Sequence, residues 1–284
     1  MPPFNRVTIV GLGLIGGSLG IAVKRRHVAK TVVGFSRTAA TLRRARRGGA
    51  IDVGTMNAQH AVCDADLVVI ATPVDTVVAQ AKRLARFMRP GSVLTDVGST
   101  KAFIVSELER TLPRGIAFVG GHPLAGSEQR GLDAANARLF DGSICVLTPT
   151  AETDPQALKR VIRFWKPLVR RVVTMSPAQH DRLLAATSHL PHALACCLVQ
   201  AVPAGPLPQA PRSFLDMTRI AKSDPGLWGA ILFTNRKNLL EQMQRFDTQW
   251  RRLRRRLSRR DRAGVWALLG AAQRRRNAME PRER

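Results

Sequence analysis

Short apolar runs alternate with longer stretches of helical composition through the first part of the chain. The runs are rich in β-branched residues and continuously apolar, a pattern typical of strands that are covered on both faces of a sheet. The expected strands are residues 7–10, 31–35, 67–71, 92–96, 117–120, 144–147 and 172–175. Their alternation with helices predicts parallel β-α-β units, and therefore an α/β fold with a doubly wound, mostly parallel sheet.

The pattern changes after Pro177. The β-branched runs disappear, and segments with helical periodicity cover residues 178–202, 227–257 and 261–272. Between the first two lies an expected loop at residues 203–211, whose prolines at 203, 206, 208 and 211 cannot continue a helix. The chain is therefore expected to divide into an α/β domain over residues 1–175 and an all-α domain over residues 176–284.

Length and cysteine usage limit the class of protein. The 284-residue chain can form one large domain or two ordinary ones. Its cysteines, Cys63, Cys145, Cys196 and Cys197, show neither metal-ligand spacing nor a disulfide framework. No charged leader precedes an apolar run, and the longest apolar stretches fall short of the ~20 residues that a membrane span needs. We therefore expect a cytoplasmic protein with no membrane segment.

The chain is strongly basic, with a net charge of +25 from 45 Lys and Arg against 20 Asp and Glu. Such an excess attracts anionic ligands and can hold nucleic acid without sequence specificity. Arginines crowd one helical segment, at positions 251, 252, 254, 255, 256, 259, 260 and 262. The favoured interpretation is a solvated helix face, so no specific nucleic-acid partner is expected. Binding of nucleic acid by this face is the alternative.

A glycine-rich turn, Gly11-x-Gly13-x-x-Gly16, follows the first expected strand and opens the next helix. In a β-α-β unit the first glycine permits a tight turn, the second lets the backbone approach a pyrophosphate, and the third allows close packing of helix on strand. The N-terminus of a helix also attracts phosphate. This context predicts a dinucleotide site, with Gly11, Gly13, Leu14, Ile15 and Gly16 in the turn and Thr72 and Pro73 after a later strand.

The end of the second expected strand indicates which dinucleotide binds. Enzymes that use NAD place an acidic residue there to bind the adenosine ribose. This chain instead has Ser36 and Arg37, which provide a hydroxyl and a guanidinium suited to a 2′-phosphate. The sequence therefore favours NADP, with NAD as the alternative cofactor and a plain surface role as the alternative for Arg37.

Two polar segments follow the fourth and fifth expected strands. Residues 96–101 contain Ser99, and residues 120–128 contain His122 and Glu128. Ligands of doubly wound sheets bind at the carboxyl ends of the strands, so Ser99 and His122 are expected to face the nicotinamide end of the cofactor. A histidine within Gly-Gly-His-Pro is not expected inside a helix or a strand. A functional His122 is therefore favoured over a core histidine.

The helical part contributes two further pairs of polar residues. His189 and His192 are three apart on one expected helix face. They could ligate zinc, but no Cys, Asp or Glu in the same segment completes a ligand set, so no metal is expected. Asp216 and Arg219 are also three apart. They could pair with each other, or Arg219 could hold a substrate carboxylate.

Taken together, these segments resemble the prephenate and arogenate dehydrogenase family of tyrosine biosynthesis. The motifs are Gly-Leu-Gly-Leu-Ile-Gly-Gly-Ser, Asp-Val-Gly-Ser-Thr-Lys, Gly-Gly-His-Pro-Leu-Ala-Gly-Ser-Glu, Ser-His-Leu-Pro-His and Asp-Met-Thr-Arg-Ile-Ala-Lys-Ser-Asp-Pro-x-x-Trp. Their order and spacing agree with the family over about residues 6–257, and the last three are specific to it. The resemblance implies a Rossmann domain, a helical substrate and dimerisation domain, a homodimer, and an active site between the domains.

The resemblance also implies a role for each polar residue. His122 corresponds to the catalytic histidine that hydrogen-bonds the C4 hydroxyl of the substrate ring, and Ser99 to a serine that helps to orient it. His192 and Arg219 match substrate-binding positions, with Arg219 the expected carboxylate partner, and His189 is a weaker match. Glu128 matches a residue near the mouth of the cleft. The implied reaction moves hydride from C4 to the nicotinamide and releases carbon dioxide from C1.

Two other functions are compatible with parts of the sequence. Another two-domain Rossmann enzyme, such as a β-hydroxyacid dehydrogenase or an imine reductase, shares the glycine-rich turn. A nucleotide-sensing binding protein would use the arginine-rich segment on nucleic acid. Within the favoured family, no residue decides between arogenate and prephenate, although Ser36 and Arg37 favour arogenate through their link with NADP. No appended regulatory domain is expected.

Overall fold

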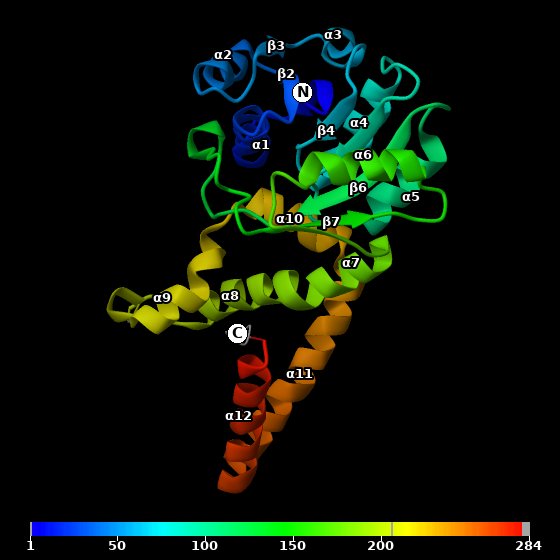
Figure 1. The fold of residues 1–284 in the computed structure, drawn as a ribbon. Coiled ribbons are helices and arrows are strands. Elements are labelled where there is room, and N and C mark those ends of the chain that lie inside the picture. Colours follow the sequence, from blue (N-terminus) through cyan, green and yellow to red (C-terminus); the bar gives the residue numbers. More distant parts are fainter. Residues whose placement is uncertain (1, 206, 280–284) are drawn as a thin grey trace. The chain divides into compact units, whose positions relative to one another are not determined.

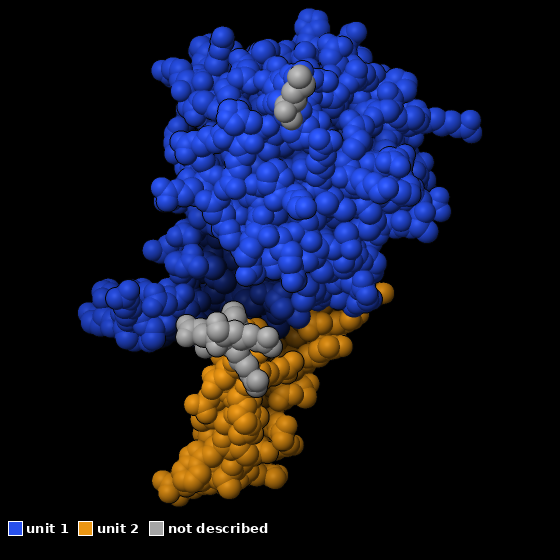
Figure 2. Space-filling model, viewed as in Figure 1, with its two compact units in different colours: residues 1–236 blue, residues 237–284 orange. Residues whose placement is uncertain are grey.

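The computed structural model describes residues 2–205 and 207–279, so the expected loop proline at position 206 lies outside the described residues. Contacts divide the chain into two compact units, residues 1–236 and residues 237–284 (Figure 2). The first unit holds the sheet, its covering helices and the helical segments between residues 177 and 234, and every predicted site residue belongs to it.

The first unit is built on an eight-stranded sheet with the order β3-β2-β1-β4-β5-β6-β7-β8 (Figure 1). The strands are β1 (Phe4–Val10), β2 (Ala29–Phe35), β3 (Val53–Thr55), β4 (Leu67–Ile70), β5 (Val93–Asp96), β6 (Ala117–Pro123), β7 (Ile144–Thr148) and β8 (Arg171–Thr174). All neighbouring pairs are parallel except β6 and β7, which are antiparallel. The prediction of a doubly wound, mostly parallel sheet is confirmed.

Helices cover both faces of this sheet, and each face has its own hydrophobic core. The first face packs on α1 (Leu14–Arg25), α2 (Ala39–Arg47) and α6 (Pro155–Trp165), with Phe164 and Trp165 among the fully buried side chains. The second face packs on α3 (Ala58–Val62), α4 (Val77–Ala85) and α5 (Ala102–Thr111), around Leu84 and Leu108. Burial on both faces explains why the strands read as continuous apolar runs.

Two details of the sheet differ from the expectation. The short, largely exposed β3 was missed, because three residues leave too little apolar pattern to detect. The strand expected at residues 117–120 continues to Pro123, so His122 does lie in a strand, contrary to the prediction. The extension is possible because β7 returns antiparallel and pairs with residues 120–123, including His122 opposite Val146.

The helical segments of the first unit begin with α7 (Pro177–Leu184) and α8 (Leu190–Ala201), joined by a π-helical turn at Ala185–His189. Figure 1 shows them as one rod. Pro191 has no N–H for the carbonyl four residues earlier, and a π turn accommodates the missing bond. By length and composition alone, Pro177–Ala201 could cross a membrane. Its buried His180 and Asp181 instead make polar contacts with the sheet side of the unit.

The helices that follow α8 differ from the expectation. A loop containing a 3-10 turn at Leu207–Gln209 leads to α9 (Arg212–Thr218), which is followed by α10 (Pro225–Thr234) and α11 (Arg236–Ser258). The prediction of a single helix over residues 227–257 is therefore wrong. It is interrupted at Asn235, which takes the non-helical φ/ψ of −113° and 24°.

The second unit consists of most of α11 and of α12 (Arg262–Asn277). Asp261 caps α12 by accepting a hydrogen bond from the Gly264 amide, and its carboxylate lies 3.6 Å from Arg256. Most arginines of the segment 251–262 are exposed, as expected for a solvated helix face. Arg251 pairs with Asp247 at 2.7 Å one turn earlier.

Candidate active site

The glycine-rich turn joins β1 to α1 and has the geometry of a phosphate cradle. Gly11 has a φ of +92°, and a Cβ there would lie 2.7 Å from the Ala71 carbonyl oxygen. A Cβ on Gly16 would overlap the Gly11 carbonyl oxygen. Gly13 differs, because a Cβ there would meet nothing within 4 Å. The N-terminus of α1, which begins after Gly13, has no side-chain cap. The turn therefore leaves open space and unsatisfied N–H groups where a pyrophosphate would bind.

The other predicted cofactor residues surround this turn. Leu14 and Ile15 form the first turn of α1. Thr72 lies against Gly11, since a Cβ on that glycine would be 2.9 Å from the Thr72 methyl carbon. Pro73 follows Thr72 and precedes a 3-10 turn at Val74–Thr76. These residues fit a dinucleotide that lies across the carboxyl ends of β1 and β4.

Ser36 and Arg37 follow β2, one strand away from the turn. Ser36 is half-buried, and Arg37 is exposed. The backbone of Gly11 donates a hydrogen bond to the carbonyl oxygen of Phe35 (3.1 Å), which ties the glycine turn to the residue before Ser36. Both side chains thus lie at the edge of the sheet where the adenosine end of a dinucleotide is bound in doubly wound folds.

His122 near the end of β6 belongs to a chain of buried polar groups. The His122 Nδ1 lies 2.9 Å from the His180 Nε2, and the His180 Nδ1 lies 2.8 Å from a carboxylate oxygen of Asp181. A carboxylate can only accept, so the His180 Nδ1–H donates to Asp181. With both rings neutral, the His180 Nε2 then accepts from the His122 Nδ1–H. The His122 Nε2 keeps its lone pair and can accept a proton.

Asp181 is held in place by the turn that follows β5. Its two carboxylate oxygens accept hydrogen bonds from the backbone N–H groups of Lys101 (2.8 Å) and Ala102 (2.9 Å). Burial opposes its ionisation, but the hydrogen bonds from His180 and these amides outweigh burial and lower the pKa of Asp181. The carboxylate therefore stays charged and orients the His180 ring.

A buried ion pair fixes the backbone beneath His122. The Lys101 ammonium is fully buried, pairs with Asp96 and donates to the Gly121 carbonyl oxygen at 3.1 Å. Asp96 in turn accepts from the amides of Gly98 (2.9 Å) and Gly121 (3.2 Å). The pair joins the end of β5, which leads to Ser99, to the end of β6, which carries His122.

Burial and nearby positive charge keep His122 neutral. Desolvation is the main cause that lowers the pKa of His122 well below its ordinary value of 6.5, and His180, Lys101 and His189 add to it. A neutral imidazole with a bare Nε2 is the form that a general base requires.

His189 and His192 lie on the same rod as His180. Burial lowers the pKa of His189 to about 4, although the Asp181 carboxylate acts in the opposite direction. The His192 ring stacks on Trp228 of α10, with a centroid distance of 3.5 Å and an interplanar angle of 7°. The His192 Nδ1 is buried and has no hydrogen-bond partner among the described residues.

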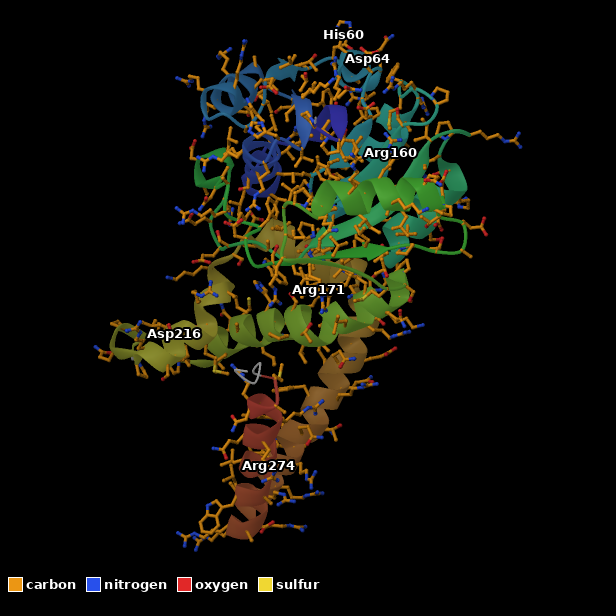
Figure 3. The ribbon with its side chains drawn as sticks, in the orientation of Figure 1. His60, Asp64, Arg160, Arg171, Asp216 and Arg274 are labelled. Carbon is orange, nitrogen blue, oxygen red and sulfur yellow. The ribbon has the colours of Figure 1, made fainter. Side chains whose placement is uncertain are left out.

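Arg219 and Glu128 form an ion pair between the loop after β6 and the turn after α9. The Arg219 Nη1 lies 2.8 Å from a Glu128 carboxylate oxygen, and both side chains are partly exposed. A backbone hydrogen bond is the first cause that lowers the pKa of Glu128, and Arg219 contributes to it. The pairing of Asp216 with Arg219, one of two sequence interpretations, does not occur. Asp216 on α9, which is labelled in Figure 3, instead lies 3.9 Å from Arg212.

Ser99 is not hydrogen-bonded to the chain of His122, His180 and Asp181 within the described residues. It is half-buried in the turn between β5 and α5, and the described part of the chain gives its hydroxyl no hydrogen bond to His122. Within the described ranges, no group of three or more His, Cys, Asp or Glu side chains is arranged to hold a metal ion.

Several residues in and around this site were not predicted from the sequence, namely Asp96, Lys101, His180, Asp181, Trp228 and Asn235. A signal existed for two of them. His180 and Asp181 are adjacent titratable residues that directly follow the helix-capping sequence Ser-Pro-x-Gln. Burial of such a pair needs a polar partner, and only the fold shows that this partner is His122.

Comparisons with known proteins agree with this geometry. Residues 19–174 match the family model "Prephenate dehydrogenase, nucleotide-binding domain", and residues 176–271 match "Prephenate dehydrogenase, dimerization domain". The chain is 36% identical to the cyclohexadienyl dehydrogenase of Zymomonas mobilis over 261 residues, which cover 89% of each protein.

Solved structures show the same similarity in three dimensions. Prephenate dehydrogenase from A. aeolicus, in complex with hydroxyphenyl propionate and NAD+, superposes with a TM-score of 0.90 at 33% identity and covers 97% of this chain and 98% of its own. Synechocystis arogenate dehydrogenase superposes with a TM-score of 0.83 at 28% identity, covering 97% of this chain and all of its own.

Proposed function

The chain belongs to the prephenate dehydrogenase family, and from this premise we propose that it oxidatively decarboxylates arogenate or prephenate with His122 as the catalytic base. The observation that carries the assignment of His122 is the buried chain His122–His180–Asp181, which leaves one imidazole nitrogen as a proton acceptor. The alternative of a purely nucleotide-sensing protein gives no reason for such an oriented base.

The proposed mechanism follows from the substrate, whose ring carries a hydrogen and a hydroxyl at C4 and a carboxylate at C1. A nicotinamide dinucleotide held at the turn of Gly11, Gly13 and Gly16 would supply the hydride acceptor for C4. The His122 Nε2 accepts the hydroxyl proton as positive character develops at C4. The C1 carboxylate leaves as carbon dioxide, its bonding electrons aromatise the ring, and the proton returns to the phenolic oxygen.

The substrate carboxylates need positive or donor groups. Arg219 can exchange its exposed Glu128 partner for a carboxylate of the substrate, because a partly exposed ion pair contributes little stability of its own. The unpaired His192 Nδ1 offers a second contact, and Trp228 fixes the plane of its ring. We assign substrate binding to Arg219, His192 and His189, orientation of the C4 hydroxyl to Ser99, and control of access to Glu128.

NADP is the cofactor that the sequence favours. The glycine turn, Leu14, Ile15, Thr72 and Pro73 would hold the pyrophosphate and its neighbours, and Ser36 with Arg37 would bind a 2′-phosphate. The lack of a carboxylate at the end of β2 supports this choice. NAD is the competing cofactor, since the A. aeolicus relative was solved with NAD+.

We also propose that the protein works as a cytoplasmic homodimer, with a dinucleotide-binding domain over residues 1–175 and a helical domain over residues 176–284. The match of residues 176–271 to a dimerisation domain supports the dimer. Exposed apolar side chains such as Leu240, Trp250 and Trp266 on α11 and α12 suit burial against a second copy. In this proposal the arginines of residues 251–262 form a solvated helix face.

One experiment tests substrate and cofactor together. The purified protein is assayed by the absorbance of the reduced nicotinamide with arogenate and with prephenate, each in the presence of NADP or NAD. Turnover with NADP and one of the two acids supports the proposal and names the substrate. Turnover with NAD alone overturns the cofactor proposal, and no turnover in any combination overturns the activity.

A further inference from the structure

Asn235 is a buried amide at the break between α10 and α11, only 3% exposed. Its Nδ2 lies 2.7 Å from the backbone carbonyl oxygen of Asp181 and 3.1 Å from the Nδ1 of His189. One side chain thus contacts both the residue that orients His180 and a histidine of the Ser-His-Leu-Pro-His segment. The catalytic chain and the substrate-binding helix are joined at this point.

These contacts determine which nitrogen of His189 carries the proton. A carbonyl oxygen can only accept, so the contact with Asp181 requires the nitrogen of the Asn235 amide, not its oxygen, to face that way. The same nitrogen has a second hydrogen, which points to the His189 Nδ1. An amide nitrogen donates only, so His189 must accept at Nδ1, and the proton of its neutral ring lies on Nε2.

Building on the proposed function, we propose that Asn235 is a positioning residue that fixes His189 as a donor at Nε2 and anchors the backbone of Asp181 behind the His180–His122 pair. His189 then offers an N–H group to an anionic or carbonyl oxygen of the substrate, while His122 offers a lone pair to its hydroxyl. The two histidines have opposite hydrogen-bonding roles, and the tertiary contacts of each ring set its role.

The surroundings of His189 support a neutral donor. The ring is 1% exposed and lies edge-on to Trp228 of α10, at a centroid distance of 6.2 Å. The titratable groups that face it are Asp181 and His180 of α7, His192 of α8 and His122 of β6. Of these groups, only Asp181 favours the protonated, charged form of His189. The Asp181 carboxylate is already bound to His180 and two backbone amides.

The first test measures the tautomer of His189 in the wild-type protein. Nitrogen NMR of the full-length protein with 15N-labelled histidine distinguishes the two neutral tautomers, and comparison with the His189→Asn protein assigns the His189 signals. We expect a bare Nδ1 and a protonated Nε2 near pH 7. A protonated Nδ1 would overturn the proposal, whatever the enzymatic activity of the protein.

The second test uses Asn235→Asp, which keeps the shape but removes both donors. Its carboxylate can only accept, so we expect the His189 proton to move to Nδ1 and the pKa of His189 to rise by about one unit or more, as an adjacent opposite charge causes. The turnover number should fall about tenfold or more, while the dissociation constant of the cofactor, measured by fluorescence, stays unchanged.

The matched control is Thr234→Val on the same turn. Thr234 also makes a side-chain hydrogen bond across the unit, with the Thr100 hydroxyl at 3.1 Å, and within the described residues its hydroxyl is not hydrogen-bonded to a histidine. This variant should lose some stability and keep the tautomer and the pKa of His189. If Asn235→Asp changed only thermal stability, as Thr234→Val does, Asn235 would be merely structural. Inactive wild-type protein would overturn the proposed function but would leave the tautomer test intact.

Discussion

The imidazoles of His122 and His180 meet through one hydrogen bond, with 2.9 Å between Nδ1 of the first and Nε2 of the second, although 58 residues separate them in the chain. His122 is on β6, at the edge of the sheet where a dinucleotide binds, and His180 is on the helix that follows Pro177. The contact therefore joins the sheet to the helical rod and determines which nitrogen of His122, the proposed base, carries the proton.

Replacing the base should abolish most of the catalysis. We expect His122→Asn to lower turnover at least ~100-fold, which is typical when a general base is lost, because asparagine has no lone pair of comparable basicity. Cofactor affinity should be unchanged, since the glycine turn lies on other strands. Steady-state kinetics and a binding titration check both statements, and unchanged turnover would refute the role of His122.

The orienting carboxylate should matter almost as much as the base. In Asp181→Asn an amide replaces the group that accepts from the His180 Nδ1–H, so His180 can reverse its tautomer and deprive His122 of its acceptor. Turnover should fall by between ten- and 10⁴-fold, roughly the range seen when the orienting acid of a histidine is lost. Asp216→Asn, at an exposed aspartate of the same unit, is the matched control and should keep wild-type kinetics.

Loss of Arg219 should weaken binding more than chemistry. We expect Arg219→Ala to raise the Michaelis constant for the cyclohexadienyl acid about tenfold or more, because a hydrogen bond to a charged group contributes about 1.5–3 kcal/mol. Arg212→Ala serves as the control, because Arg212 is exposed and lies at the other end of α9. An unaffected Michaelis constant would place the carboxylate site elsewhere.

Cofactor choice should depend on Arg37. In Arg37→Ala the Michaelis constant for NADP should rise about tenfold or more and that for NAD should stay the same, because only NADP carries the 2′-phosphate that a guanidinium binds. The neighbouring Arg43→Ala on α2 tests whether any nearby positive charge has the same effect. Equal changes in the Michaelis constants for NADP and NAD would show that Arg37 does not bind the 2′-phosphate.

Stability should decline in mild acid because of His189. Its pKa is about 4 in the folded protein and about 6.5 when unfolded, so between these values the unfolded chain binds the extra proton. The free energy of unfolding therefore falls as the pH drops from about 6.5 towards 4, by at most on the order of 3 kcal/mol from this group. Urea titrations at several pH values measure this slope, and His189→Gln should reduce it. An equal slope in the wild-type and His189→Gln proteins would contradict the lowered pKa of His189.

Local sequence patterns determined the α/β fold and the cofactor cradle. Apolar runs flanked by helical stretches specify strands buried on both faces, and Gly11, Gly13 and Gly16 describe a turn whose constraints are local to one strand and one helix. The candidate residues His122, His192 and Arg219 were found through short motifs in the same way. Their spacing along the chain was enough to mark them, but it did not reveal their partners.

Only the tertiary structure decided the hydrogen-bond partners and the course of the chain around them. His180 and Asp181 reach the site because α7 contacts His122 and the turn after β5, and Asn235 reaches Asp181 from the end of α10. The bonded residues are 54 to 80 positions apart, which no local periodicity encodes. The antiparallel return of β7 placed His122 inside a strand, and the break at Asn235 ended a helix that its apolar pattern predicted to continue. The protonation of each histidine depends on these long-range contacts, since a ring nitrogen donates or accepts according to the group opposite it.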